Sequence, residues 1–162
     1  MANLCWKGLE KLKSVLLGSG NTTLAEIAAR DQTYWKPFEE KSVLLHNIAP
    51  DLADRNKGTV YPAVYLYAAK VENLPRQKFA GFSGPIRLVA DLRSTGERYE
   101  GLEREITTYV EAVTTALLAN TGSWGDGLIY SGAYAVKFET VKLGGRNFIQ
   151  SAKVELEVEA CG

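Results

Sequence analysis

Apolar and polar residues alternate most clearly along residues 82–93. Phe82, Ile86, Leu88, Ala90 and Leu92 would share one face of this stretch, and Ser83, Arg87, Asp91 and Arg93 the other. A period of two residues is typical of a β-strand that buries one face. The same alternation over residues 60–69, 134–139 and 152–159 predicts three more strands. Between the last two, Gly144 and Gly145 predict a tight hairpin turn, since glycine adopts positive φ angles freely.

Helical spacing of apolar residues predicts two longer helices. An N-terminal helix over residues 4–17 would bury Leu9, Leu12 and Leu16, and Gly18 and Gly20 are expected to end it. A central helix is predicted by one apolar stripe, which consists of Leu102, Ile106, Tyr109, Val110, Val113 and Leu117.

The pattern is weakest at about residues 21–58. Thr23 followed by Glu26 fits a capping box, which predicts a short helix to about Tyr34. Beyond it, Pro37, Pro50 and other turn-forming residues interrupt the chain. We therefore expect an irregular excursion over most of residues 21–58.

These elements predict one α+β domain over residues 1–162. It would contain an antiparallel or mixed four-stranded sheet packed against the N-terminal helix and the central helix, in the order α, excursion, β, β, α, β, β. The helix residues expected to pack on the sheet are Leu102, Ile106, Val110, Val113 and Leu117. The sheet face expected to receive them carries Ile86, Leu88, Ala90, Val136, Phe138, Val154 and Leu156. The opposite face of the sheet would stay polar.

Composition narrows the functional classes. Hydrophobic residues make up 46% of the chain and charged residues 23%, which are values of a globular protein. Nineteen basic side chains balance nineteen acidic ones, so the chain lacks the overall positive field with which nucleic-acid binders attract phosphates. No segment approaches the ~20 consecutive apolar residues of a membrane span. A soluble protein made in the cytosol is the expectation, with no membrane partner and no sequence-specific nucleic-acid partner.

Few residues suggest a catalytic, cofactor-binding or metal-binding role. Cys5 and Cys161 lack further ligands at metal-binding spacing, so two free thiols are favoured over a zinc site, and a disulfide would require the two ends of the chain to meet. His46 has no nearby nucleophile or carboxylate pattern. The glycine-rich run from Gly122 to Gly127 lacks the lysine and hydroxyl of a phosphate-binding loop and fits a turn better. We therefore expect no catalytic, cofactor-binding or metal-binding residue and no enzyme.

Two features suggest a contact surface instead. The polar connector over residues 70–78 is longer than a tight turn and has local positive charge from Lys70, Arg76 and Lys78. Tyr65 and Tyr67 lie on the strand face opposite the expected core. Aromatic residues can stack on bases, but no basic groove accompanies these tyrosines, so a core or interface role is favoured. The candidate interface residues are Tyr65, Tyr67, Lys70, Arg76 and Lys78.

The order of elements resembles tail-terminator, or tail-completion, proteins of long-tailed bacteriophages. The resemblance covers residues 4–17 and 60–159. It depends on the leading helix, the strand opening Val60-Tyr61-Pro62-Ala63-Val64-Tyr65-Leu66, the strand from Ile86 to Arg93, the helix from Leu102 to Leu117 and the closing strands around Ala135-Val136-Lys137-Phe138.

The resemblance implies a small α+β subunit of the virion tail or neck, made in the host cytoplasm. Such subunits assemble as a hexameric ring on the end of the tail tube, stop its growth and meet the head connector, and in contractile tails also the sheath. The expected partners are therefore further copies of the chain, the tail tube protein and connector proteins. Another neck or tail-tube component is the first alternative, and a small-molecule-binding α+β domain is the second.

Overall fold

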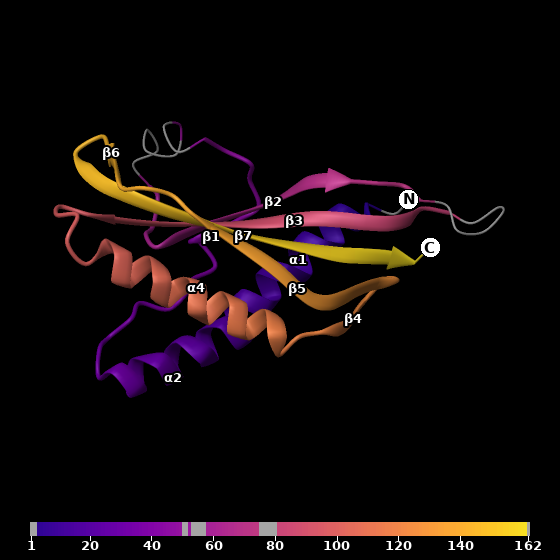
Figure 1. Cartoon of the computed structure of the whole chain (residues 1–162), viewed down its shortest axis with the longest axis horizontal. Coiled ribbons are helices and arrows are strands. Elements are labelled where there is room, and N and C mark those ends of the chain that lie inside the picture. The colour runs from indigo at the N-terminus through magenta and orange to yellow at the C-terminus, as the bar shows by residue number, and fades with distance from the viewer. Residues whose placement is uncertain (1–2, 50–51, 53–57, 75–80, 162) are drawn as a thin grey trace.

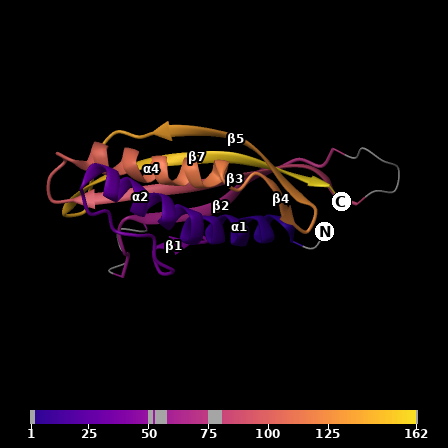
Figure 2. The same ribbon diagram turned by 90° about the horizontal axis from the view of Figure 1, so that it is seen from below.

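The chain forms one curled sheet with helices on one side. The computed structural model describes residues 3–49, 52, 58–74 and 81–161. Its elements are α1 (Leu4–Val15), the π-helical turn η1 (Leu16–Gly20), α2 (Asn21–Asp31), β1 (Val43–Leu44), β2 (Ala63–Val71), β3 (Ser83–Gly96), α4 (Leu102–Leu118), β4 (Gly122–Gly125), β5 (Leu128–Phe138), β6 (Lys142–Gly144) and β7 (Asn147–Cys161). Figures 1 and 2 show that α1, α2 and α4 all lie against the same face, which we call the inner face.

Within the described residues the sheet has seven strands rather than four. Their order is β1-β2-β3-β7-β5-β4, and β6 pairs with β7 beside that path. β1 runs parallel to β2, whereas every other pairing is antiparallel. The predicted four-stranded sheet with the order α, excursion, β, β, α, β, β is therefore wrong. The additional strands β1, β4 and β6 have only two, four and three residues, which is too short for alternation to reveal them.

The N-terminal helix does not end at Gly18 and Gly20. The chain passes through the π-helical turn directly into α2, so the expected capping box at Thr23 does not form. Asn21 supports this junction, because its Nδ2 donates to the carbonyl oxygens of Leu17 and Phe38 and its Oδ1 accepts from the Phe38 amide. The expected excursion at 21–58 therefore begins with a helix, and it also contributes strand β1.

The main core lies between α4, the α1–α2 helix and the inner face of the sheet. The residues expected to pack here are largely buried together, namely Ile106, Val110, Val113 and Leu117 of α4 with Ile86, Leu88, Ala90, Val154 and Leu156 of the sheet. Val136 is only partly buried. Phe138, which was also assigned to this core, is 48% exposed. Phe138 lies on the predicted face of the sheet. Its side chain is exposed because β5 is an open edge of the sheet at this residue.

The outer face of the sheet is not uniformly polar. Residues 44–48 cover its β2 end, where Leu44, Ile48 and Tyr61 pack around Ala63 and Tyr65 in a second small cluster. This cover also buries two charged side chains of β3, Asp91 and Arg93, at 4% and 1% exposure. The prediction of a polar outer face is wrong at this end, because the covering segment comes from a part of the chain that showed no regular pattern.

Glu105 in α4 makes the stability of the fold depend on pH. Burial raises the pKa of this carboxyl above its usual 4.5. The folded chain therefore binds the proton more tightly than the unfolded chain, and the free energy of unfolding should fall as pH rises from about 4.5 through the raised pKa. Urea unfolding across this range should show a weaker decline in Glu105→Gln. Glu26→Gln, which removes one exposed carboxylate, is the matched control. An identical slope of the free energy of unfolding against pH in both variants would contradict the raised pKa of Glu105.

Candidate functional site

β5 forms an open edge of the sheet beyond residue 130. β4 pairs only with the stretch Leu128–Tyr130 of this strand, whereas β7 pairs with it as far as Phe138. Over residues 131–138, which we call the β5 edge, the described part of the chain places a strand on one side only. Such an edge presents unpaired backbone N–H and C=O groups to another chain.

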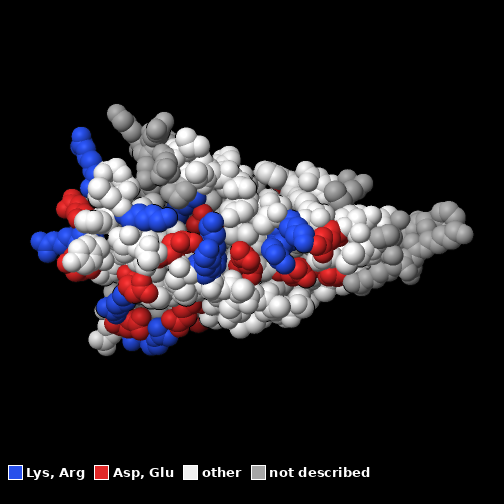
Figure 3. Space-filling view, turned by 45° about the horizontal axis from the view of Figure 1, so that its top comes forward, with Lys and Arg blue, Asp and Glu red and all other residues white. Residues whose placement is uncertain are grey.

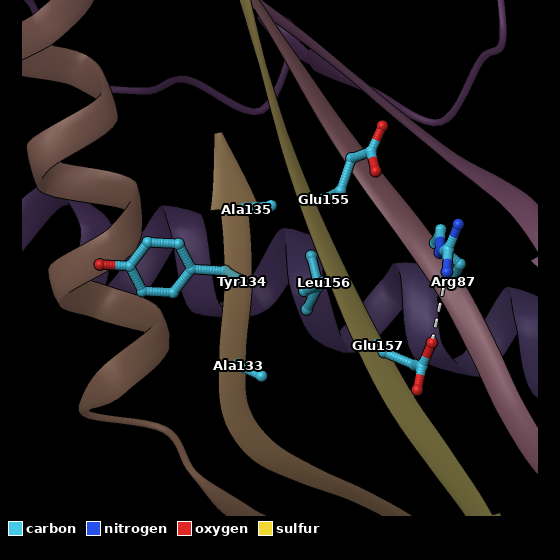
Figure 4. A pocket seen from close by; sticks show the side chains of 7 residues that line it. All are labelled: Arg87, Ala133, Tyr134, Ala135, Glu155, Leu156 and Glu157. Atoms are coloured by element: carbon cyan, nitrogen blue, oxygen red, sulfur yellow. Dashed lines mark ion pairs between the residues drawn. The ribbon is translucent and has the colours of Figure 1, made fainter. Parts of the chain in front are cut away.

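Apolar side chains accompany this edge. Tyr134 is 40% exposed and Phe138 48%, and Leu118 at the end of α4 is 54% exposed. Figure 4 shows the Tyr134 ring projecting from β5 toward α4, away from the other labelled side chains. The β5 edge therefore combines free backbone groups with apolar surface, a combination that suits strand addition by a partner.

A bulge explains why β4 pairs with so little of β5. The register with β7 shifts between Tyr130 and Tyr134, and Gly132 within this bulge has a φ of 99°. The Tyr130 hydroxyl donates to the Ala133 carbonyl oxygen at 3.2 Å, and burial raises the pKa of Tyr130 to about 12. A bulge bends its strand and interrupts the ladder, so the β5 edge is separated from β4.

β2 provides a second, different open edge. β1 pairs only with Val64 and Tyr65 of β2. Over residues 66–71, which we call the β2 edge, no described strand pairs with the side of β2 opposite β3. Val71 near its end is 39% exposed. The two open edges therefore lie at opposite sides of one sheet and have different sequences.

The candidate interface residues do not form one surface. Tyr65 is buried, and the Arg93 guanidinium stacks on its ring at 4.3 Å. Tyr67 is partly buried on the outer face. Lys70 is exposed and forms an ion pair with Glu72. Arg76 and Lys78 lie outside the described residues. The exposed side chains of the β5 edge were missed because alternation identifies the face of a strand but not whether the strand has a neighbour.

The outer face has charges of both signs and a shallow hollow. Figure 3 shows acidic and basic side chains alternating across it. The hollow, of about 320 Å³, is lined by Arg87, Ala133, Tyr134, Ala135, Glu155, Leu156 and Glu157. Arg87 and Glu157 face each other across 3.7 Å, as Figure 4 shows. The small alanines leave the space open. The described residues of the lining contain no nucleophile beside a base.

The structure also shows where the other residues lie that were considered for a catalytic, phosphate-binding or metal-binding role. Asp126 and Gly127 both have positive φ, at 53° and 78°, and form the two-residue turn between β4 and β5. His46 is exposed. Cys5 and Cys161 are free thiols, and burial raises the pKa of Cys5. Among the described residues, no group of His, Cys, Asp and Glu side chains could hold a metal ion.

Comparison of the chain with protein-family models and with curated proteins found no match. In the part of the chain that the structure describes, no helix has both the length and the apolar character to cross a membrane.

Proposed function

We propose that the chain is a virion structural protein, a tail terminator that caps the tail tube as a ring and joins the tail to the head connector. The proposal is supported by the resemblance, which is limited to the order of the long elements α1, β2, β3, α4, β5 and β7, and by one structural observation, the two unlike open edges of a single sheet. A closed ring uses heterologous contacts, in which one patch of each subunit meets a different patch of the next. The β5 edge and the β2 edge supply two such patches.

Strand pairing between neighbouring subunits is the proposed contact. The β5 edge of one copy would pair with the β2 edge of the next, so that the sheet continues around the ring through backbone hydrogen bonds. Tyr134, Phe138 and Leu118 would then lose their exposure to water. The resemblance implies six copies, with the tail tube protein and the connector proteins, and in a contractile tail the sheath, on the ring's faces.

Imaging of virus particles tests this function. Particles produced without the protein should have tails of irregular length or tails that are not joined to heads. Tails of uniform length that remain joined to heads would refute the terminator role.

A single substitution on the β5 edge should reproduce the loss. Phe138→Glu places a charge on the proposed contact, and each subunit carries it, so every interface of the ring is affected. Because Phe138 is half-exposed, the monomer should remain folded, with a change in the free energy of unfolding below about 1 kcal/mol. Complementation with this variant should give few joined particles.

Tyr34→Glu is the matched control. Tyr34 follows α2, belongs to no strand and is 80% exposed. This variant should support normal particles. Equal particle yields from a folded Phe138→Glu variant and from Tyr34→Glu would remove the β5 edge from the interface.

A further inference from the structure

A second hollow lies on the outer face, beside the segment that covers the β2 end. We call it the outer hollow. It measures about 370 Å³, and its lining consists of Asn47, Ile48, Ala49, Tyr67, Asp91, Arg93, Glu139, Lys142, Ser151 and Lys153. Strands β2, β3, β6 and β7 all contribute to it. Tyr67 of the β2 edge lines it, whereas the exposed open-edge residues Tyr134, Phe138 and Val71 do not.

Arg93 supplies a positive charge whose hydrogen bonding is incomplete. Its Nη2 donates to Asp91 Oδ2 at 2.8 Å and to the Ile48 carbonyl oxygen at 2.6 Å. Among the described residues, its Nε and Nη1 have no partner, and neither has Asp91 Oδ1. The side chain is only 2% exposed. Buried donors without partners are costly, so a group that accepts from them inside the hollow would stabilise the fold.

Lysines add to the positive charge. The register places Lys153 of β7 directly opposite Lys137 of β5 on one side and Asp91 of β3 on the other. Like charges directly opposite each other destabilise a sheet. Lys142 of β6 also lines the hollow. The lining thus has three basic side chains and two acidic ones. Lys137, opposite Lys153, borders it and forms an ion pair with Glu139 at 3.6 Å.

We propose that the outer hollow binds an oxyanion. An anionic group there would accept hydrogen bonds from Lys142 and Lys153, relieve the repulsion between Lys153 and Lys137 and offset the excess positive charge. Two sources have this chemistry: a small free anion such as phosphate, and the carboxylate of an acidic side chain on a neighbouring protein. The proposal does not depend on the terminator function, because Lys142 and Lys153, which would bind the anion, lie outside residues 131–138 and 66–71 of the two open edges.

Nuclear magnetic resonance of the whole chain provides the test. Sodium phosphate is added while sodium chloride keeps the ionic strength constant, since screening alone changes surface electrostatics. The backbone amide signals of Lys142, Ser151 and Lys153 should shift and saturate. In the variant with both Lys142→Gln and Lys153→Gln, binding should weaken at least about tenfold, because two charge-assisted hydrogen bonds are lost.

Lys11→Gln, on α1 at the other side of the sheet, is the matched control and should bind phosphate as the unmodified chain does. The single variant Lys142→Gln changes an exposed residue, so it keeps the test available if the double variant does not fold. A second titration uses a triglutamate peptide. Tighter binding of phosphate would identify a small anion, and tighter binding of the peptide would identify an acidic side chain. Shifts that never saturate with either probe, or equal affinity in the lysine variants, would overturn the proposal.

Discussion

Replacing Arg93 by methionine is expected to lower the free energy of unfolding by about 3–5 kcal/mol. Arg93 and Asp91 are almost completely buried, and their side chains pair at 2.8 Å beneath residues 44–48. Removal of the guanidinium leaves the Asp91 carboxylate, which is only 4% exposed, without its opposite charge. The Ile48 carbonyl oxygen would also lose its donor, so the covering segment should loosen from the sheet.

A double variant separates the unpaired charge from the loss of packing. Asp91→Leu combined with Arg93→Met removes both charges while filling similar volume, and replacements of this kind are often neutral or stabilising. Chemical unfolding should therefore show the double variant close to the unmodified chain and well above Arg93→Met. If both variants lose the same stability, the cost comes from the stacking of Arg93 on Tyr65 rather than from the charge.

Truncation of the main core should have an effect of similar size. Leu88 of β3 and Leu117 of α4 are completely buried. Gly8 of α1 packs so closely on Leu88 that a Cβ at Gly8 would lie 3.3 Å from the leucine's Cδ1. Leu88→Ala and Leu117→Ala should each cost about 2–5 kcal/mol, because the helices and the sheet cannot close completely over the cavity left behind.

Thermal and urea unfolding of the two core variants would measure this cost. Leu143→Ala, at a position that is 71% exposed, serves as the control for removal of the same side chain and should change stability by less than about 0.5 kcal/mol. Unchanged unfolding in both core variants would mean that α4 does not pack on the inner face.

Much of the helix–sheet core was predictable because its pattern is local. Successive side chains of a strand point to opposite faces, so alternation alone placed Ile86, Leu88 and Ala90 together. The stripe of α4 follows in the same way from the period of the helix. Residues that usually end a helix were a less reliable guide to where the helices end. Gly18 and Gly20 were expected to end a helix, yet the hydrogen bonds of Asn21 to Phe38 connect the junction to a distant segment and help the helix continue.

The candidate sites depended on contacts between distant segments. Asp91 and Arg93 were correctly placed opposite the main core, but a segment that includes Ile48, 45 residues before Arg93, buries them, and no local pattern indicated that cover. Phe138 shows the same limit. The face on which it lies was predicted correctly, but its exposure depends on whether a strand lies next to β5, and no described strand does so there.

Alternation and helical spacing were therefore enough to establish the faces of the long strands and of α4, because covalent geometry sets the direction of each side chain. The number of strands, the two open edges, the buried Arg93–Asp91 pair and the outer hollow arise from which segments pair and cover one another. Those choices reflect the free energy of burying whole surfaces far apart in the chain, and only the folded structure reveals them.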